Sequence, residues 1–249
     1  STWNTWYENG NKRFLATYSD GKLNGKYTRW YQGGIIKEQD GDYTNNKKHN
    51  RWVFWAKNGQ KSEEINYNTG IQNGPHIKWF GDSSDQHKKF HKNFKNGEKD
   101  GAWHYWYTTG VDSLKSSYLE GKKDGHWVWW RSNGLKDKEG FYKKEKKHGV
   151  WTVWNDSSGT AYHKLHEETF VNDIIDGSVT KWYKEGDIDR QGVMRGKERE
   201  GEWTYWERGG KKWLKFDYGN GLERVTLGEI EERDGITYKI GKYEPYVGI

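Results

Sequence analysis

The chain has 249 residues, a formal net charge of +6 and a mean hydropathy of −1.27, and only 31% of its residues are hydrophobic. So polar a composition is typical of disordered chains, but these are poor in aromatic residues, whereas this chain holds 17 Trp and 17 Tyr. The absence of cysteine excludes disulfides, thiol catalysis and thiolate metal sites, and no apolar run is long enough for a membrane-spanning helix.

A tryptophan recurs along the chain at a nearly constant spacing. Successive members are separated by 24, 25, 24, 27, 24, 24, 28 and 24 residues. A fixed period of this length is the mark of a repeat protein, so we predict nine tandem repeats. We name these nine tryptophans the anchor column: Trp6, Trp30, Trp55, Trp79, Trp106, Trp130, Trp154, Trp182 and Trp206.

A second aromatic column, the preceding column, lies three residues before most anchors. It is interrupted at His76 and Val179. Residues three apart on a strand point to opposite sides of a sheet, so each side should carry its own ladder of rings, with lysine stems lying over the rings. The preceding column consists of Trp3, Tyr27, Trp52, Trp103, Trp127, Trp151 and Trp203.

Residues 97–120 form one regular repeat and show its internal order. Residues 102–107 read as a first strand, 108–110 as a turn and 114–119 as a second strand, and residues 120–125 lead to the next repeat. Asn-Gly pairs recur at expected turns, because both residues tolerate the positive φ of tight hairpins. These pairs begin at Asn9, Asn24, Asn58, Asn96 and Asn133.

The repeats therefore predict an all-β fold: an elongated, twisted single antiparallel sheet of tandem hairpins. The period ends after Gly221, while residues 222–249 lose tryptophan but keep an alternating pattern, as expected for a C-terminal β cap. The nine repeats are placed near residues 1–20, 21–45, 46–69, 70–96, 97–120, 121–144, 145–171, 172–195 and 196–221.

The fourth and seventh repeats are longer than the others, and each carries Asp-Ser-Ser followed by two histidines. Two interpretations stay open: a longer hairpin loop, or a rim that contacts a partner. Zinc binding is disfavoured, because residues four apart on a strand lie about 13 Å apart. The candidate contact residues are Asp82, His87, His91, Asp156, His163 and His166.

The regular repeat also resembles a known family through Gly97, Gly101, Trp103, Trp106, Tyr107, Gly110 and Tyr118. These residues look like the MORN repeat, and more closely resemble the bacterial MORN-variant repeat of the YwqK-type antitoxin family. The resemblance covers roughly residues 1–221. It implies a hairpin-repeat sheet used for protein contacts, with membrane or lipid association proposed for some relatives. It implies no catalytic residues.

No catalytic, phosphate-binding or dinucleotide-binding motif is present, so we expect neither an enzyme nor a cofactor. The aromatic ladders have three interpretations: they hold the sheet together, they stack on sugars, or they stack on bases. The nearly balanced charge and the lack of a basic stripe disfavour nucleic acid as a partner.

The sequence thus favours a non-enzymatic scaffold that binds another protein or protein complex, as an accessory subunit of a bacterial surface or envelope assembly. Tyr105, Trp129 and Tyr205 are predicted to be exposed rungs that contact the partner. The alternatives are a glycan- or cell-wall-binding module and an antitoxin or immunity protein. An extracytoplasmic location is expected, because the chain starts without Met inside a repeat and lacks cysteine. A cytoplasmic location stays open.

Overall fold

The computed structural model describes residues 1–81, 86–156 and 161–218, and in these ranges it contains twenty β-strands and no helix. The predicted all-β hairpin-repeat fold is confirmed. The chain divides into two compact segments, Ser1–Leu135 and Lys136–Ile249, which we name the N-terminal and C-terminal segments. The predicted cap at residues 222–249 lies outside the described residues, as does Asp82.

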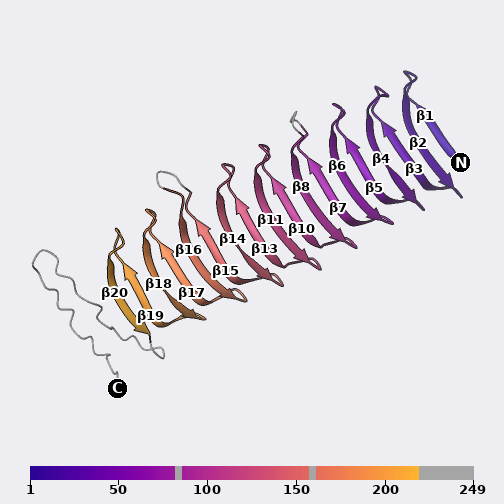
Figure 1. Ribbon diagram of the computed structural model, residues 1–249. Coiled ribbons are helices and arrows are strands. Elements are labelled where there is room, and N and C mark those ends of the chain that lie inside the picture. Colours follow the sequence, from indigo (N-terminus) through magenta and orange to yellow (C-terminus); the bar gives the residue numbers. More distant parts are fainter. Residues whose placement is uncertain (82–85, 157–160, 219–249) are drawn as a thin grey trace, which may run out of the picture. The chain divides into compact units, whose positions relative to one another are not determined.

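In the N-terminal segment the strands lie side by side in chain order, and each pairs antiparallel with its neighbours (Figure 1). Short strands β9 and β12 precede β10 and β13. The strands are β1 (Thr2–Trp6), β2 (Lys12–Ser19), β3 (Lys22–Trp30), β4 (Lys37–Thr44), β5 (Lys47–Trp55), β6 (Lys61–Asn68), β7 (Ile71–Trp79), β8 (Lys88–Lys95), β9 (Glu98–Lys99), β10 (Gly101–Trp106), β11 (Asp112–Leu119), β12 (Lys122–Lys123) and β13 (Gly125–Trp130).

The C-terminal segment continues the same pattern of antiparallel neighbours. In both segments each anchor tryptophan is the last residue of the first strand of its repeat. The strands are β14 (Lys136–Lys143), β15 (Lys146–Trp154), β16 (Lys164–Val171), β17 (Ile174–Trp182), β18 (Ile188–Arg195), β19 (Glu198–Trp206) and β20 (Lys212–Tyr218).

The turn between one repeat and the next is a tight two-residue turn. At Asn96–Gly97 both residues have positive φ, 50° and 87°, as the type I′ hairpin turn requires. The predicted turn at Asn24–Gly25 is wrong, because both residues lie inside β3. Gly25 has φ 110° and lies between Leu23 and Tyr27, where β3 has two more residues than the paired part of β2, so this glycine column marks a bulge within β3 and its equivalents.

The preceding column forms the buried side of the sheet, which we name the first face. Trp52 is 0% exposed and Trp103 is 5% exposed. The indole N–H of Trp103 donates a 2.8 Å hydrogen bond to the backbone carbonyl of Asn93, ten residues earlier, on the adjacent strand β8. The same bond, at 2.9–3.1 Å, joins Trp52 to Asp42, Trp127 to Ser117, Trp151 to Phe141 and Trp203 to Val193. In these five repeats the indole ring therefore ties the two strands of neighbouring repeats together.

Candidate interaction surfaces

The anchor column lies on the opposite side of the sheet, which we name the second face. Trp103 packs against Tyr105 and Tyr118, whereas Trp106 lies against His104 with ring centroids 3.6 Å apart and the rings tilted by 33°. Beyond Trp6, the anchors are half-buried. The expected lysines lie over them, with the ammonium 5.3–6.0 Å from the ring centroid of the next repeat's anchor. These pairs are Lys12–Trp30, Lys37–Trp55, Lys61–Trp79, Lys88–Trp106, Lys136–Trp154 and Lys164–Trp182.

A row of carboxylates on the second face is held by the same lysines. Glu64 accepts two bonds of 2.6 Å from the guanidinium of Arg51 and lies 3.8 Å from the ammonium of Lys61. The bonds from Arg51 hold the pKa of Glu64 below its usual value. Comparable contacts join Lys37 to Asp40, Lys136 to Glu139 and Lys164 to Glu167. Each of these repeats thus presents a fixed acidic group beside a fixed basic one.

A hydroxyl bond also links the turns of neighbouring repeats. The hydroxyl of Tyr107 donates a 2.8 Å hydrogen bond to the backbone carbonyl of Trp130, the anchor of the next repeat. The sequence pattern contained this tyrosine, directly after the anchor, but did not show what it bonds. The same bond at 2.8 Å joins Tyr7 to Trp30, Tyr31 to Trp55 and Tyr183 to Trp206.

The prediction that Tyr105, Trp129 and Tyr205 are exposed rungs is wrong, because all three side chains are half-buried on the first face. Tyr105 packs between Phe90 and Trp103, at centroid distances of 6.1 and 6.4 Å. Burial raises the pKa of Tyr105 to about 12. Burial, together with a hydrogen bond to Tyr218, also raises the pKa of Tyr205 to about 12. These rings add to the packing of the sheet.

Two of the predicted rim histidines brace the following repeat. His87 lies against Gly110 with a ring nitrogen 3.0 Å from the Thr108 carbonyl, in the next turn. His163 lies against Gly186, and its Nε2 is 3.1 Å from the Tyr183 carbonyl. These contacts favour the longer-loop interpretation of the insertions.

The other predicted rim residues do not form a common site with His87 and His163. His91 lies within β8, where its backbone pairs with His104, and His166 lies within β16. Burial lowers the pKa of both His91 and His166. Asp156 is exposed at the start of its loop. Over the parts of the chain that the structure describes, no group of three or more His, Cys, Asp or Glu side chains could hold a metal ion.

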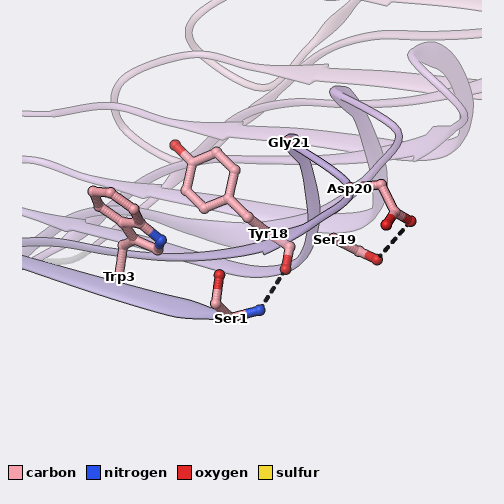
Figure 2. Close-up of a pocket in the computed structure, with 6 residues that line it drawn as sticks. All are labelled: Ser1, Trp3, Tyr18, Ser19, Asp20 and Gly21. Atoms are coloured by element: carbon pink, nitrogen blue, oxygen red, sulfur yellow. Dashed lines mark hydrogen bonds between the residues drawn. The ribbon is translucent and has the colours of Figure 1, made fainter.

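A shallow hollow lies at β1, the first strand of the N-terminal segment. Figure 2 shows Trp3 beside Tyr18, with the terminal amine of Ser1 2.6 Å from the Tyr18 carbonyl. Trp3 is 62% exposed, whereas Trp52 at the same repeat position is 0% exposed. Each interior ring is covered by the strand before it, so the hollow reflects the position of β1.

The C-terminal segment carries five exposed apolar side chains on its second face. Two of these side chains lie in one row across four strands. Val150 pairs with Thr169, and Val193 pairs with Ser178. The hydroxyl oxygens of Thr169 and Ser178 are 3.0 Å apart and link the two pairs. We name this set the apolar strip: Phe141, Val150, Val171, Ile174 and Val193, which are 47%, 45%, 39%, 49% and 41% exposed.

The strip was missed by sequence reasoning, although a signal existed. The repeat position of Val150 holds Lys26, Arg51 and Glu202 in other repeats. The same position holds Pro75, Ala102, His126 and Ser178 in further repeats, so the change from charged to apolar is visible against some repeats only.

No family model matches the chain, and no curated protein matches it. Within the described ranges, no helix is long and apolar enough to cross a membrane.

Proposed function

We propose that the chain is a non-enzymatic scaffold that binds another protein or protein complex along the second face of its sheet. The observation that carries the proposal is the row of paired charges on this face, of which Glu64 with Arg51 is the best-formed member. The carboxylates occur in two successive repeats of each segment, as Asp40 and Glu64 and as Glu139 and Glu167, and the members of each pair lie about two strand spacings apart, roughly 9–10 Å. Such pairs suit a partner surface that runs across the strands of a segment.

The fixed geometry of the row favours binding. The carboxylates are already held by Lys or Arg, and the lysines lie over tryptophan rings, as with Lys61 between Glu64 and Trp79. Side chains that are ordered before binding lose less conformational entropy when a partner docks. The resemblance to the MORN-variant repeat supports protein contact as the use of this surface, and the envelope assembly stays a prediction of the sequence.

The proposal is tested by affinity capture of the tagged native protein followed by mass spectrometry. We expect one defined protein in stoichiometric amount, and an antitoxin role would appear as a single tightly bound toxin. Soluble oligosaccharide should leave the tryptophan fluorescence unchanged, because lysines lie over the anchor rings. Quenching by oligosaccharide without any captured protein would overturn the proposal in favour of a glycan-binding module.

A variant without the two insertions tests whether they form a rim that contacts the partner. Replacing residues 81–86 and 156–161 by short Asn-Gly turns removes both insertions while leaving the flanking strands. If the insertions contact the partner, capture is lost although the circular dichroism spectrum is unchanged. Unchanged capture would assign the binding to the face of the sheet alone.

A further inference from the structure

The apolar strip differs in chemistry from the rest of the second face. At its centre, Thr169 and Ser178 lie on β16 and β17, with Val150 on β15 to one side and Val193 on β18 to the other. Val171 pairs with Ile174 on the same two central strands. Exposed apolar side chains on five neighbouring strands, grouped around two small hydroxyl residues and flanked by charges, are typical of a protein-binding surface.

The two ends of the strip carry opposite charge. On the β14 and β15 side, Lys143 pairs with Lys146, and both are exposed. On the β19 side, Glu198 is exposed and pairs with Arg195, whose charge is engaged by Glu200 at 2.8 Å. The end at β18 and β19 thus holds two carboxylates, Glu198 and Glu200, beside the guanidinium of Arg195, whereas Lys143 and Lys146 make the end at β14 and β15 basic.

This order is self-complementary. A two-fold axis parallel to the strands, between β16 and β17, would place Val150 of one copy over Val193 of the other and Val171 over Ile174. The same axis brings Lys143 of each copy over Glu198 of its partner, and Lys146 over Arg195, whose charge is offset by Glu200 at 2.8 Å. A surface that matches itself under a two-fold rotation is the requirement for the commonest kind of homodimer.

We propose that the apolar strip is the interface through which two copies of this chain pack face to face. Two sheets packed with aligned strands lie about 10 Å apart, with side chains of the inner faces interdigitated. The strip and its charged ends span six strands, β14 to β19, or about 24 Å. A surface of this width lies at the small end of specific interfaces, so we expect a dimer that dissociates on dilution.

The first experiment measures the dissociation constant of the full chain by sedimentation equilibrium. Val171→Lys places a charge at the centre of the interface and should weaken the dimer about tenfold or more, because that charge would be buried without a partner. The matched control is Leu119→Lys, since Leu119 is 54% exposed and also ends the second strand of its repeat, in the N-terminal segment. The control should dimerise as the native chain does.

A charge exchange tests the orientation. Lys143→Glu and Glu198→Lys should each weaken the dimer, and the double variant should restore it, because the two residues face each other across the axis. Urea unfolding of every variant checks that the fold is retained. A native chain that stays monomeric, equal effects of Val171→Lys and Leu119→Lys, or no recovery in the double variant would each overturn the proposal. A monomeric chain that still captures a protein partner would leave the scaffold function intact.

Discussion

The backbone of Gly140 lies directly beneath the indole ring of Trp151: a Cβ atom at Gly140 would come within 2.2 Å of that ring. Gly41 beneath Trp52 and Gly192 beneath Trp203 repeat the relationship, with distances of 2.4 and 2.3 Å. A notch without a side chain on one strand therefore receives the buried tryptophan of the next strand. This contact, together with the indole hydrogen bond, gives a one-layer sheet close packing.

Gly140→Ala should lower the free energy of unfolding by about 1–3 kcal/mol, because the added methyl forces the Trp151 ring out of the notch. The measurement is urea unfolding followed by tryptophan fluorescence. The matched control is Gly33→Ala, since a Cβ at Gly33 would meet nothing within 4 Å. Equal effects of the two substitutions would contradict the role of the notch.

Tyr107→Phe should lower the free energy of unfolding by about 0.5–1.5 kcal/mol, because it removes only the hydroxyl that bonds the Trp130 carbonyl. Tyr67→Phe is the control, since burial raises the pKa of Tyr67 while no hydrogen bond from its hydroxyl occurs among the described residues. We expect that control to be nearly neutral. A loss in Tyr67→Phe as large as in Tyr107→Phe would show that ring packing, and not the hydroxyl bond, accounts for the effect.

The strand order could be predicted from the sequence, because the constant spacing of the tryptophans and the types of side chain between them both indicate tandem β-hairpins. The anchor tryptophan ends a strand in every repeat, and the alternation of Trp103 and Trp106 places them on opposite faces. Which column is buried could not be predicted, because this depends on the notch at Gly140 and its equivalents on a neighbouring strand. The glycine at Gly25 looked like a turn because bulges and turns use the same positive φ.

The candidate surfaces were harder to predict. A ring such as Tyr105 has the same residue type whether it packs against Phe90 or meets solvent, so composition cannot distinguish the two. The pairing of Val171 with Ile174 across a turn depends on the register of β16 and β17. The register places on one face of the sheet apolar residues that lie far apart in the chain, such as Phe141 and Val193.

The free energy of unfolding should fall as the pH drops below the ordinary histidine value. Burial lowers the pKa of His91, His104 and His166 from 6.5, with Asp112 opposing the shift at His104. The unfolded chain then binds more protons than the folded one, so stability decreases between the unfolded pKa and the lower folded pKa. Urea midpoints from about pH 7.5 to about pH 5.5 measure the effect.

The double variant His91→Gln, His166→Gln is the control for this pH dependence. It removes two of the groups that titrate in this window, and its unfolding midpoint should change less with pH than that of the native chain. A native chain whose midpoint is constant over the window would contradict the prediction.

Alkaline pH should destabilise the chain through its buried phenols. The pKa of Tyr105 and of Tyr205 is raised from 10.0 to about 12, chiefly by burial. The unfolded chain loses these protons first, so the free energy of unfolding is unaffected below pH 10 and falls as the pH rises towards 12. Phenolate absorbance in the native chain should show a late titration step that Tyr105→Phe reduces. A step of unchanged size in that variant would contradict the assignment to Tyr105.

The ion pairs of the sheet should differ widely in their contribution to stability. Arg51 holds Glu64 with two bonds of 2.6 Å, and the Glu64 side chain is only 15% exposed. Arg208 lies 3.5 Å from Glu185, and the two side chains are 73% and 49% exposed. Water and salt screen the exposed pair of Arg208 and Glu185. The bond between Arg51 and Glu64 is bidentate, and its carboxylate is largely removed from solvent.

Arg51→Met keeps the stem of the side chain and should cost about 1–2 kcal/mol, because the Glu64 carboxylate loses both bonds. Arg208→Met should cost less than about 0.5 kcal/mol. Urea unfolding of both variants at low and high salt measures the difference, and the effect of Arg51→Met should persist at high salt because the pair is partly buried. If the two substitutions cost the same at low salt, the paired charges on the second face are loosely held and are not ordered before a partner binds.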